Sequence, residues 1–141
     1  MPHPIAYLAF DGNCAEAVRF YEKALDARLE LMMSNGESPM AAMCSPDTLD
    51  RIMHARLALP GGGLLYAGDC RTDTPYRGIQ GVSLALNYDS VAEAARVFDA
   101  LCAGGQVTMP MQPSFWAKAW GMCVDRFGVA WIVNGELLPI G

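Results

Sequence analysis

An internal repeat constrains the fold of this chain more than any other feature of its sequence. Residues 14–24, CAEAVRFYEKA, align without a gap with residues 91–101, VAEAARVFDAL, at an offset of 77 positions. Four aligned positions are identical, and Glu16 and Glu93 are among them. Self-similarity at a fixed offset indicates that a chain builds copies of one supersecondary unit. We therefore expect two similar halves.

Each copy of the repeat predicts a helix that begins with a capping box. Asn13 and Ser90 stand where an N-cap residue belongs, and a glutamate follows three residues later in both copies. Apolar residues recur at helical spacing behind each cap, for example at Ala94, Phe98 and Leu101. This spacing predicts one buried stripe on each helix.

Strands are predicted on both sides of each helix. The strands before the helices cover residues 5–10 and 82–87, and those after the helices cover residues 28–33 and 106–111. Residues 54–69 align with residues 119–134 at an offset of 65 and add a hairpin to each copy. Each copy is therefore a β-α-β-β-β unit, over about residues 4–70 and 81–136. Because the offset falls from 77 to 65, the first copy holds twelve extra residues, which form a long loop within residues 34–51.

Two tandem units of this kind resemble the vicinal oxygen chelate superfamily, which includes glyoxalase I, bleomycin-resistance proteins and extradiol dioxygenases. The similarity is greatest to its PhnB-like branch, which is labelled after a 3-demethylubiquinone-9 3-methyltransferase. The motifs that carry the resemblance are F-x-G-N-C-A-E-A (10–17), M-H-A (53–55), the strand end 66–69, and F-W-x(4)-G-x(3)-D-R-F-G-V-x-W-I-x-N (115–134). The resemblance implies an α+β fold in which residues 1–141 form a single domain. In that fold a mixed, curved sheet surrounds a concave cavity, the helices lie outside, and the protein is a homodimer with a small-molecule ligand.

The resemblance also implies four positions for the ligands of a divalent metal, on the first and last strand of each unit. In this sequence those positions hold Ala6, Ala67, Ser83 and Ile132, and a shift of one residue on the last strands gives Tyr66 and Trp131. Divalent ions need several carboxylate or imidazole donors, and none of these residues supplies one. We therefore predict no metal at the standard positions, and we do not carry over glyoxalase or dioxygenase activity.

Strand alternation predicts which side chains of the first hairpin line the cavity. His54, Arg56, Leu65, Ala67 and Asp69 are expected on the cavity face, and Leu57, Leu59, Leu64 and Tyr66 on the helix face. If residues 60–63 form the hairpin loop, His54 lies opposite Asp69. This pair has three interpretations. It is a structural hydrogen bond, a catalytic acid–base pair in which Asp69 orients the His54 tautomer, or the start of a displaced metal site with Cys70 or Asn134.

The second hairpin predicts a similar division of faces. We expect Gly121, Cys123, Ile132 and Asn134 toward the cavity, and Trp120, Met122, Val124, Trp131 and Val133 toward the helix. Phe115 and Trp116 have two interpretations. They line a pocket and stack on a flat ligand, or they lie at an interface between subunits. The candidate ligand-binding residues are thus Arg56, Ser83, Phe115, Trp116, Cys123 and Asn134.

Charge and composition indicate which kinds of partner and which cellular compartment to expect for the protein. The formal net charge of the chain is -5, and no cluster of Lys and Arg is present to follow a phosphate backbone, so we expect no nucleic-acid partner. No apolar stretch is long enough to span a membrane, and the start, MPHPIAYLAF, lacks the features of a signal peptide. Five scattered cysteines without a C-x-x-C motif indicate reduced thiols. We expect a cytoplasmic protein.

Three functions stay open. The first is a protein that binds a small organic ligand, anionic or aromatic, without a cofactor, as bleomycin-resistance proteins do; Arg56 and His54 would supply the positive spot in the cavity. The second is an enzyme with a displaced metal or with acid–base chemistry at His54 and Asp69. The third is a partner-binding role that exposes Phe115 and Trp116. We expect no methyl transfer, because no glycine-rich nucleotide loop follows the first strand.

Methionines gather around the predicted long loop. They are Met32, Met33, Met40, Met43 and Met53. Methionine is flexible and polarisable, so we expect either an adaptable apolar lining or lid at this loop, or ordinary core filling.

Overall fold

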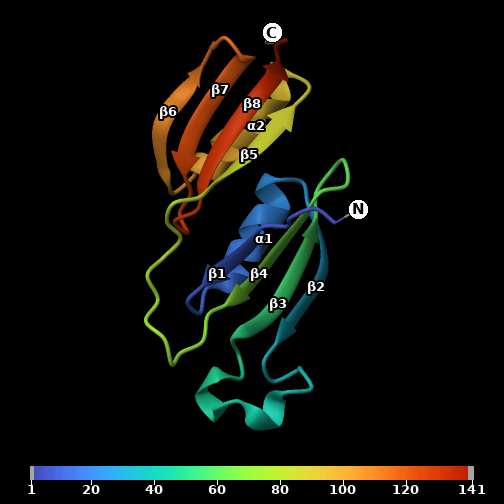
Figure 1. Ribbon diagram of the computed structural model, residues 1–141, viewed down its shortest axis with the longest axis vertical. Helices are drawn as coiled ribbons and strands as arrows, with labels where there is room; N and C mark the ends of the chain where they lie inside the picture. The colour runs from blue at the N-terminus through green and yellow to red at the C-terminus, as the bar shows by residue number, and fades with distance from the viewer. Residues whose placement is uncertain (1, 140–141) are drawn as a thin grey trace. The chain divides into compact units, whose positions relative to one another are not determined.

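The computed structural model describes residues 2–139, and it divides the chain into two α+β units between Gly78 and Ile79. Each unit consists of a four-stranded mixed sheet and one helix, in the order β-α-β-β-β (Figure 1). The predicted fold of two tandem units is therefore confirmed. Among the described residues, no helix has the length and apolar character needed to cross a membrane.

The first unit contains a sheet in the strand order β1-β4-β3-β2. Its elements are β1 (Tyr7–Phe10), α1 (Cys14–Ala24), β2 (Arg28–Ser34), β3 (Ile52–Ala58) and β4 (Leu64–Asp69). β1 pairs in parallel with β4, and the other neighbours are antiparallel. The predicted long loop joins β2 to β3 and includes two short 3₁₀ turns, η1 (Ala41–Met43) and η2 (Pro46–Thr48).

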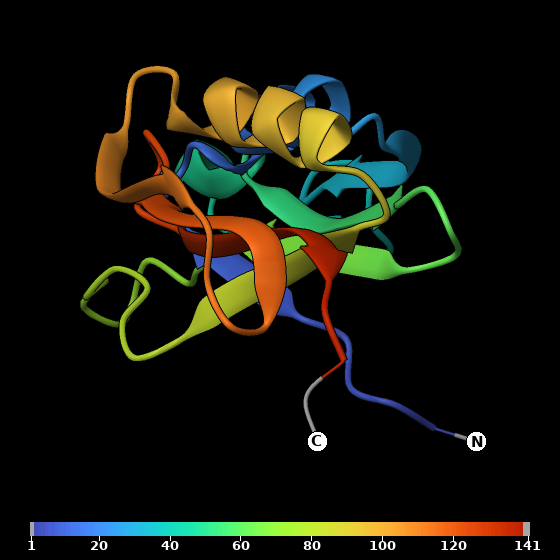
Figure 2. The ribbon, with the colours of Figure 1, turned by 90° about the horizontal axis from the view of Figure 1, so that it is seen from above.

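The second unit repeats this topology with the order β5-β8-β7-β6. Its elements are β5 (Ser83–Tyr88), α2 (Val91–Cys102), β6 (Gln106–Gln112), β7 (Ala117–Val124) and β8 (Ala130–Leu137). β5 pairs in parallel with β8, while β7 is antiparallel to both of its neighbours. Figure 2 shows α2 lying across one face of this sheet.

The core of each unit lies between the helix and one face of the sheet. In the first unit it includes Leu8, Phe10, Val18, Tyr21, Leu57 and Leu65, and in the second unit Val97, Phe98, Leu101, Cys123, Trp131 and Val133. Burial of each large apolar side chain contributes about 1.5–3 kcal/mol. Trp131 belongs to the core as predicted, and its indole Nε1 donates to the buried carboxylate of Asp125 at 2.8 Å. The opposite face of each sheet, here called the open face, is not covered by the helix of its own unit.

The two helices are capped differently. Ser90 accepts a hydrogen bond from the Glu93 backbone N–H, as the capping box predicts. Asn13 makes no such side-chain bond. Instead, the Asp69 carboxylate at the end of β4 accepts from the backbone N–H groups of Gly12 and Cys14, at 2.8 and 3.1 Å. A negative charge at this position also favours the N-terminus of α1.

The predicted register of the first hairpin is wrong by one residue. The Leu59 N–H donates to the Gly63 carbonyl, so the loop comprises residues 60–62, and Ala58 pairs with Leu64. This slip reverses the faces of β4 relative to β3, because side chains alternate with a period of two. Leu65 and Ala67 therefore pack under the helix, whereas Leu64 and Tyr66 lie on the open face.

The faces of β7 in the second hairpin are also the reverse of those predicted. Cys123 pairs with Trp131, which belongs to the core, so both side chains lie on the helix face. Gly121 and Cys123 point toward α2, and Trp120, Met122 and Val124 lie on the open face. The faces of β8 are as predicted, with Trp131 and Val133 in the core and Ile132 on the open face.

Candidate functional site

Three rings from three strands meet on the open face of the first unit. They are Tyr7 of β1, His54 of β3 and Tyr66 of β4, and we call them the ring cluster. The His54 ring centroid lies 5.0 Å from that of Tyr66 and 5.6 Å from that of Tyr7. The two phenol rings are 6.1 Å apart, edge to face. The cluster forms because β4 lies between β1 and β3, and the corrected register puts Tyr66 on the same face as His54.

A hydrogen bond fixes the imidazole within the ring cluster. The Tyr7 hydroxyl oxygen lies 3.1 Å from His54 Nδ1 and 3.2 Å from the Met53 carbonyl oxygen. If the hydroxyl donates to Met53, Nδ1 carries the proton and donates to Tyr7, which leaves Nε2 as an acceptor. Partial burial, followed by the negative charge of a Cys14 thiolate, raises the pKa of the Tyr7 phenol above its ordinary value of 10.0. Tyr7 is therefore a neutral hydrogen-bonding group at pH 7.

Gly68 makes room for the Tyr7 ring. A Cβ atom at position 68 would lie 3.0 Å from the Tyr7 hydroxyl oxygen and 3.0 Å from the Met53 carbonyl oxygen. A larger residue would therefore displace the phenol that holds His54. Tyr7, Tyr66 and Gly68 were not predicted from the sequence as site residues. The correct hairpin register would have revealed Tyr66, because it reverses the alternation along β4.

Arg56 lies on the same open face but does not carry an unpaired charge. Its Nε lies 3.0 Å from Glu30 Oε1, and Glu30 Oε2 lies 2.8 Å from an Arg28 nitrogen. Two guanidinium groups thus share one carboxylate, which leaves a net formal charge of +1 on the group. Arg56 is therefore not the lone cationic side chain that was predicted for this face.

The predicted contact between His54 and Asp69 does not occur. His54 belongs to the open face, whereas the Asp69 carboxylate lies on the helix face and accepts three backbone hydrogen bonds, from Gly12, Cys14 and Ile52. The cause is again the one-residue slip, which places Gly68 opposite His54. Asp69 has a structural role in this arrangement, and it neither orients His54 nor shares a metal site with it.

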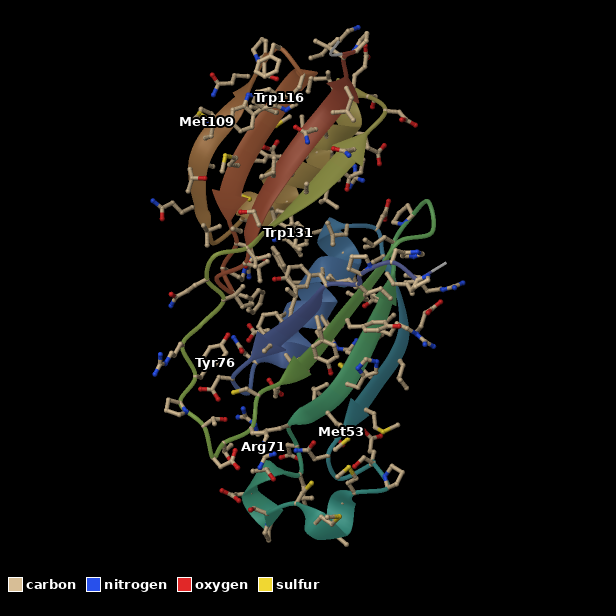
Figure 3. The ribbon with its side chains drawn as sticks, viewed as in Figure 1. Met53, Arg71, Tyr76, Met109, Trp116 and Trp131 are labelled. Atoms are coloured by element: carbon tan, nitrogen blue, oxygen red, sulfur yellow. The ribbon has the colours of Figure 1, made fainter. Side chains whose placement is uncertain are left out.

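The open face of the second unit contains a different group of side chains, which we call the tryptophan cluster. The Trp116 indole Nε1 donates to Asn134 Oδ1 at 3.1 Å, and Asn134 Nδ2 donates to Asn87 Oδ1 at 2.9 Å. The Trp116 ring also contacts that of Trp120 in a tilted arrangement, with centroids 4.8 Å apart, and meets Phe115 edge to face at 4.9 Å. Trp116 lies just before β7 (Figure 3). The structure thus brings three predicted residues together, namely Phe115, Trp116 and Asn134.

The other predicted residues of the second unit lie elsewhere. Cys123 was expected in the cavity, but it is only 1% exposed and packs under α2. Burial, followed by the neighbouring Cys102, raises the pKa of its thiol to about 12, so Cys123 is neither a ligand contact nor a nucleophile. Ser83 is exposed at the start of β5, where it pairs with Ala130 at the end of the strand remote from Asn87.

The side chains at the metal positions of the superfamily do not fit a divalent ion. Ala67 packs under the helix, and Ala6, Ser83 and Ile132 supply neither imidazole nor carboxylate. Within residues 2–139, no three His, Cys, Asp or Glu side chains gather into a group that could hold a metal ion. We therefore assign no divalent ion to these four positions.

The fold and the sequence agree on the class of this protein. Residues 3–133 match the Glyoxalase/Bleomycin resistance protein/Dioxygenase superfamily, and the chain belongs to this superfamily. It is 34% identical over 138 residues to the protein YjdN of Escherichia coli strain K12, covering 91% of each chain. The crystal structure of PA1353 from Pseudomonas aeruginosa has a TM-score of 0.88 and 48% identity, over 96% of this chain and 98% of that one. The PhnB protein of Bacillus cereus has the same fold, with a TM-score of 0.77 at 22% identity over 94% and 98% of the two chains.

Proposed function

We propose that this protein binds a small planar organic anion on the open face of the first unit. The observation that carries the proposal is the ring cluster, in which two phenols and an imidazole from three strands meet at the surface of a sheet. Aromatic edges and faces provide contact area for a flat ligand, and a few polar groups fix its orientation. Tyr7 and His54 supply such polar groups.

The charge near the ring cluster favours an anionic ligand. The group of Arg28, Glu30 and Arg56 has a net formal charge of +1. No described residue hydrogen-bonds to His54 Nε2, so this atom is available to a ligand carboxylate, phenolate or carbonyl group. An aromatic carboxylate combines the flat body and the negative charge that this surface would recognise.

Nuclear magnetic resonance titration tests the proposal with stated probes. We would add benzoate, salicylate and phenylpyruvate to isotope-labelled protein, with benzyl alcohol as an uncharged control. The expected result is that one or more anions shift the resonances of the ring cluster, and that Tyr7→Phe and His54→Ala weaken this binding. Lys118→Ala in the second unit is the matched control. Binding that is equally strong in the His54→Ala protein would contradict the proposal.

A catalytic function is the second candidate, and the hydrogen bond between Tyr7 and His54 supports it. A fixed imidazole with an accepting Nε2 can remove a proton from a carbon beside a carbonyl group. Tyr7 replaces Asp69 as the residue that would orient the ring. Hydrogen–deuterium exchange at the methylene carbon of phenylpyruvate would reveal such a base, with wild type faster than His54→Ala. Exchange at the same rate in both proteins would contradict a catalytic role for His54 and would favour a protein that only binds its ligand.

We also propose that the protein assembles as a homodimer. The exposed apolar surface of the second unit supports this, since Phe115 is 75% exposed and Leu137 is half-exposed. Phe115 also contacts the Trp116 ring, and contiguous exposed aromatic surface of this kind marks interfaces between subunits. Light scattering should give twice the chain mass, and Phe115→Ser should shift the protein toward the monomer. A monomeric wild type would refute the proposal.

A further inference from the structure

A cavity of about 470 Å³ lies in the first unit, beside the long loop between β2 and β3. Its lining includes five sulfur-containing side chains: Met40, Met43, Cys44, Met53 and Cys70. The chain has nine methionines and five cysteines in 141 residues, so this is a marked local enrichment. Figure 3 labels Met53 at the start of β3 and Arg71 beyond the end of β4, on two sides of this region.

Three separate segments bring these sulfur atoms to one cavity. Met40, Met43 and Cys44 come from η1 and its flanking residues, Met53 comes from β3, and Cys70 follows β4. The Cys70 backbone N–H donates to the Phe10 carbonyl at 2.6 Å, which ties its position to β1. The Cys44 Sγ donates to the Met40 carbonyl at 3.3 Å, so this thiol turns back over η1.

The thioethers are not buried as core side chains would be. Met43 is 80% exposed and Met40 is 49% exposed. Large apolar side chains that stay exposed do not gain the free energy of burial, so ordinary core filling does not explain these two residues. Sulfur donors that remain reachable from solvent are what a binding site for a soft ion requires.

The charges around the cavity do not oppose a cation. An Arg51 nitrogen lies 2.9 Å from Asp11 Oδ1 and 2.8 Å from the Cys70 carbonyl oxygen. Arg71 is paired with Asp73 through two hydrogen bonds. Each guanidinium group of the lining is thus matched by a carboxylate. The Cys70 Sγ itself lies 3.5 Å from the Arg51 nitrogen and donates to Asp11 Oδ1 at 3.7 Å, so an ion bound at Cys70 replaces the contact with Asp11, while the nearby guanidinium favours the thiolate.

We propose that this cavity binds a soft monovalent cation of the copper(I) class. The thiolates of Cys44 and Cys70 and the thioethers of Met40 and Met53 coordinate the ion. Thiolate and thioether ligands select copper(I) over hard divalent ions. Each thiol releases its proton to solvent as it binds, and the oxidation state of the ion does not change. The site is separate from the ring cluster and independent of the function proposed for it.

Competition with the chelator bicinchoninate tests this site. The purple copper(I) complex of bicinchoninate would be mixed under anaerobic conditions with fully reduced protein. Wild type should withdraw one equivalent of copper and reduce the colour. A Cys44→Ser/Cys70→Ser double variant should bind at least about tenfold more weakly. Loss of colour that is the same in wild type and in the double variant would overturn the proposal, as would a wild type that withdraws no copper.

Two further variants separate coordination from misfolding and from other thiols. Met40→Leu/Met53→Leu keeps the apolar volume but removes two thioethers, and it should weaken binding while leaving the thermal unfolding temperature nearly unchanged. Cys102→Ser removes a thiol of the second unit, outside the cavity, and should bind copper as wild type does. If Cys102→Ser alone abolished binding, the copper would lie beside Cys102 and Cys123, and the proposal would be wrong.

Discussion

The two units have the same topology but different open faces. The first unit displays the ring cluster, with an imidazole and two phenols, whereas the second displays the tryptophan cluster, in which one of two indoles, that of Trp116, donates to a pair of hydrogen-bonded asparagines. Their helix faces are alike in being apolar and buried. The comparison indicates that packing against the helix restricts one face of each sheet to apolar side chains, while the other face can hold different functional groups in the two units. Only the first unit has a titratable ring at its centre.

The largest expected difference between the units concerns Asp69 and Asn134, which are aligned by the repeat, with Asp69 at the end of β4 and Asn134 within β8. Asp69→Ala removes the acceptor of three backbone N–H groups and should lower the free energy of unfolding by about 3 kcal/mol. Asn134→Ala removes side-chain hydrogen bonds at the open face and should cost about 1 kcal/mol. Urea denaturation measures both. Equal losses would show that the two residues have the same structural role.

A second pair of variants compares the two faces of a sheet through glycine. Gly121→Ala places a Cβ 2.8 Å from the Phe98 ring under α2, and overpacking of this kind costs about 1–3 kcal/mol. Gly68→Ala places a Cβ 3.0 Å from the Tyr7 hydroxyl and 3.0 Å from the Met53 carbonyl oxygen on the open face, where the phenol can move toward solvent. We expect a smaller loss of stability from Gly68→Ala, together with a changed resonance of the His54 ring, because the hydrogen bond between Tyr7 and His54 is broken. An unchanged His54 resonance would contradict this role of Gly68.

The overall fold could be predicted from the sequence because its signals are redundant. The repeat at residues 14–24 and 91–101, the helix caps and the hairpins all indicate the same order of elements, and an error of one residue in any of them leaves that order intact. The face of a strand has no such tolerance. A one-residue error in the first hairpin loop was enough to pair His54 with Asp69, and the reversed faces of β7 placed Cys123 in the cavity.

The repeat itself contained a similar ambiguity. Three residues separate β1 from α1, but only two separate β5 from α2. The offset that aligns the helices therefore aligns Phe10, which is buried, with Asn87, which is on the open face. Tyr7 was not predicted as a site residue for this reason, because its position depends on which side chains of β1 point to the open face. Asn134 and Trp131 were placed correctly because the faces of β8 were predicted correctly, and Trp116, which was identified by its chemistry, contacts Asn134.

The buried thiols predict a pH effect that both units share. Burial raises the pKa of Cys14 in the first unit and of Cys123 in the second from 9.0 to about 12. The unfolded chain loses these protons at lower pH than the folded chain does, so the free energy of unfolding is unaffected below pH 9 and falls between pH 9 and 12. Denaturation at several pH values should show a shallower fall in Cys14→Ala and in Cys123→Ala. A fall of unchanged steepness in both variants would argue against the thiols as its cause.

The smallest expected effects on stability come from removing the ion pairs of the open faces. Removal of the pair in the first unit, but not of the pair in the second, is expected to weaken ligand binding. Arg56 is paired with Glu30 in the first unit, and Lys118 with Glu136 in the second. Exposed pairs of this kind contribute about 0–1 kcal/mol, so Arg56→Ala and Lys118→Ala should both unfold nearly as wild type does.

Arg56→Ala also removes the net positive charge beside the ring cluster. It should therefore weaken the binding of an aromatic carboxylate, and added salt should weaken wild-type binding in the same direction. Lys118→Ala should bind as wild type does, because the tryptophan cluster is not the proposed anion site. Equal loss of binding in both variants would mean that the general charge of the protein, rather than the first open face, attracts the ligand.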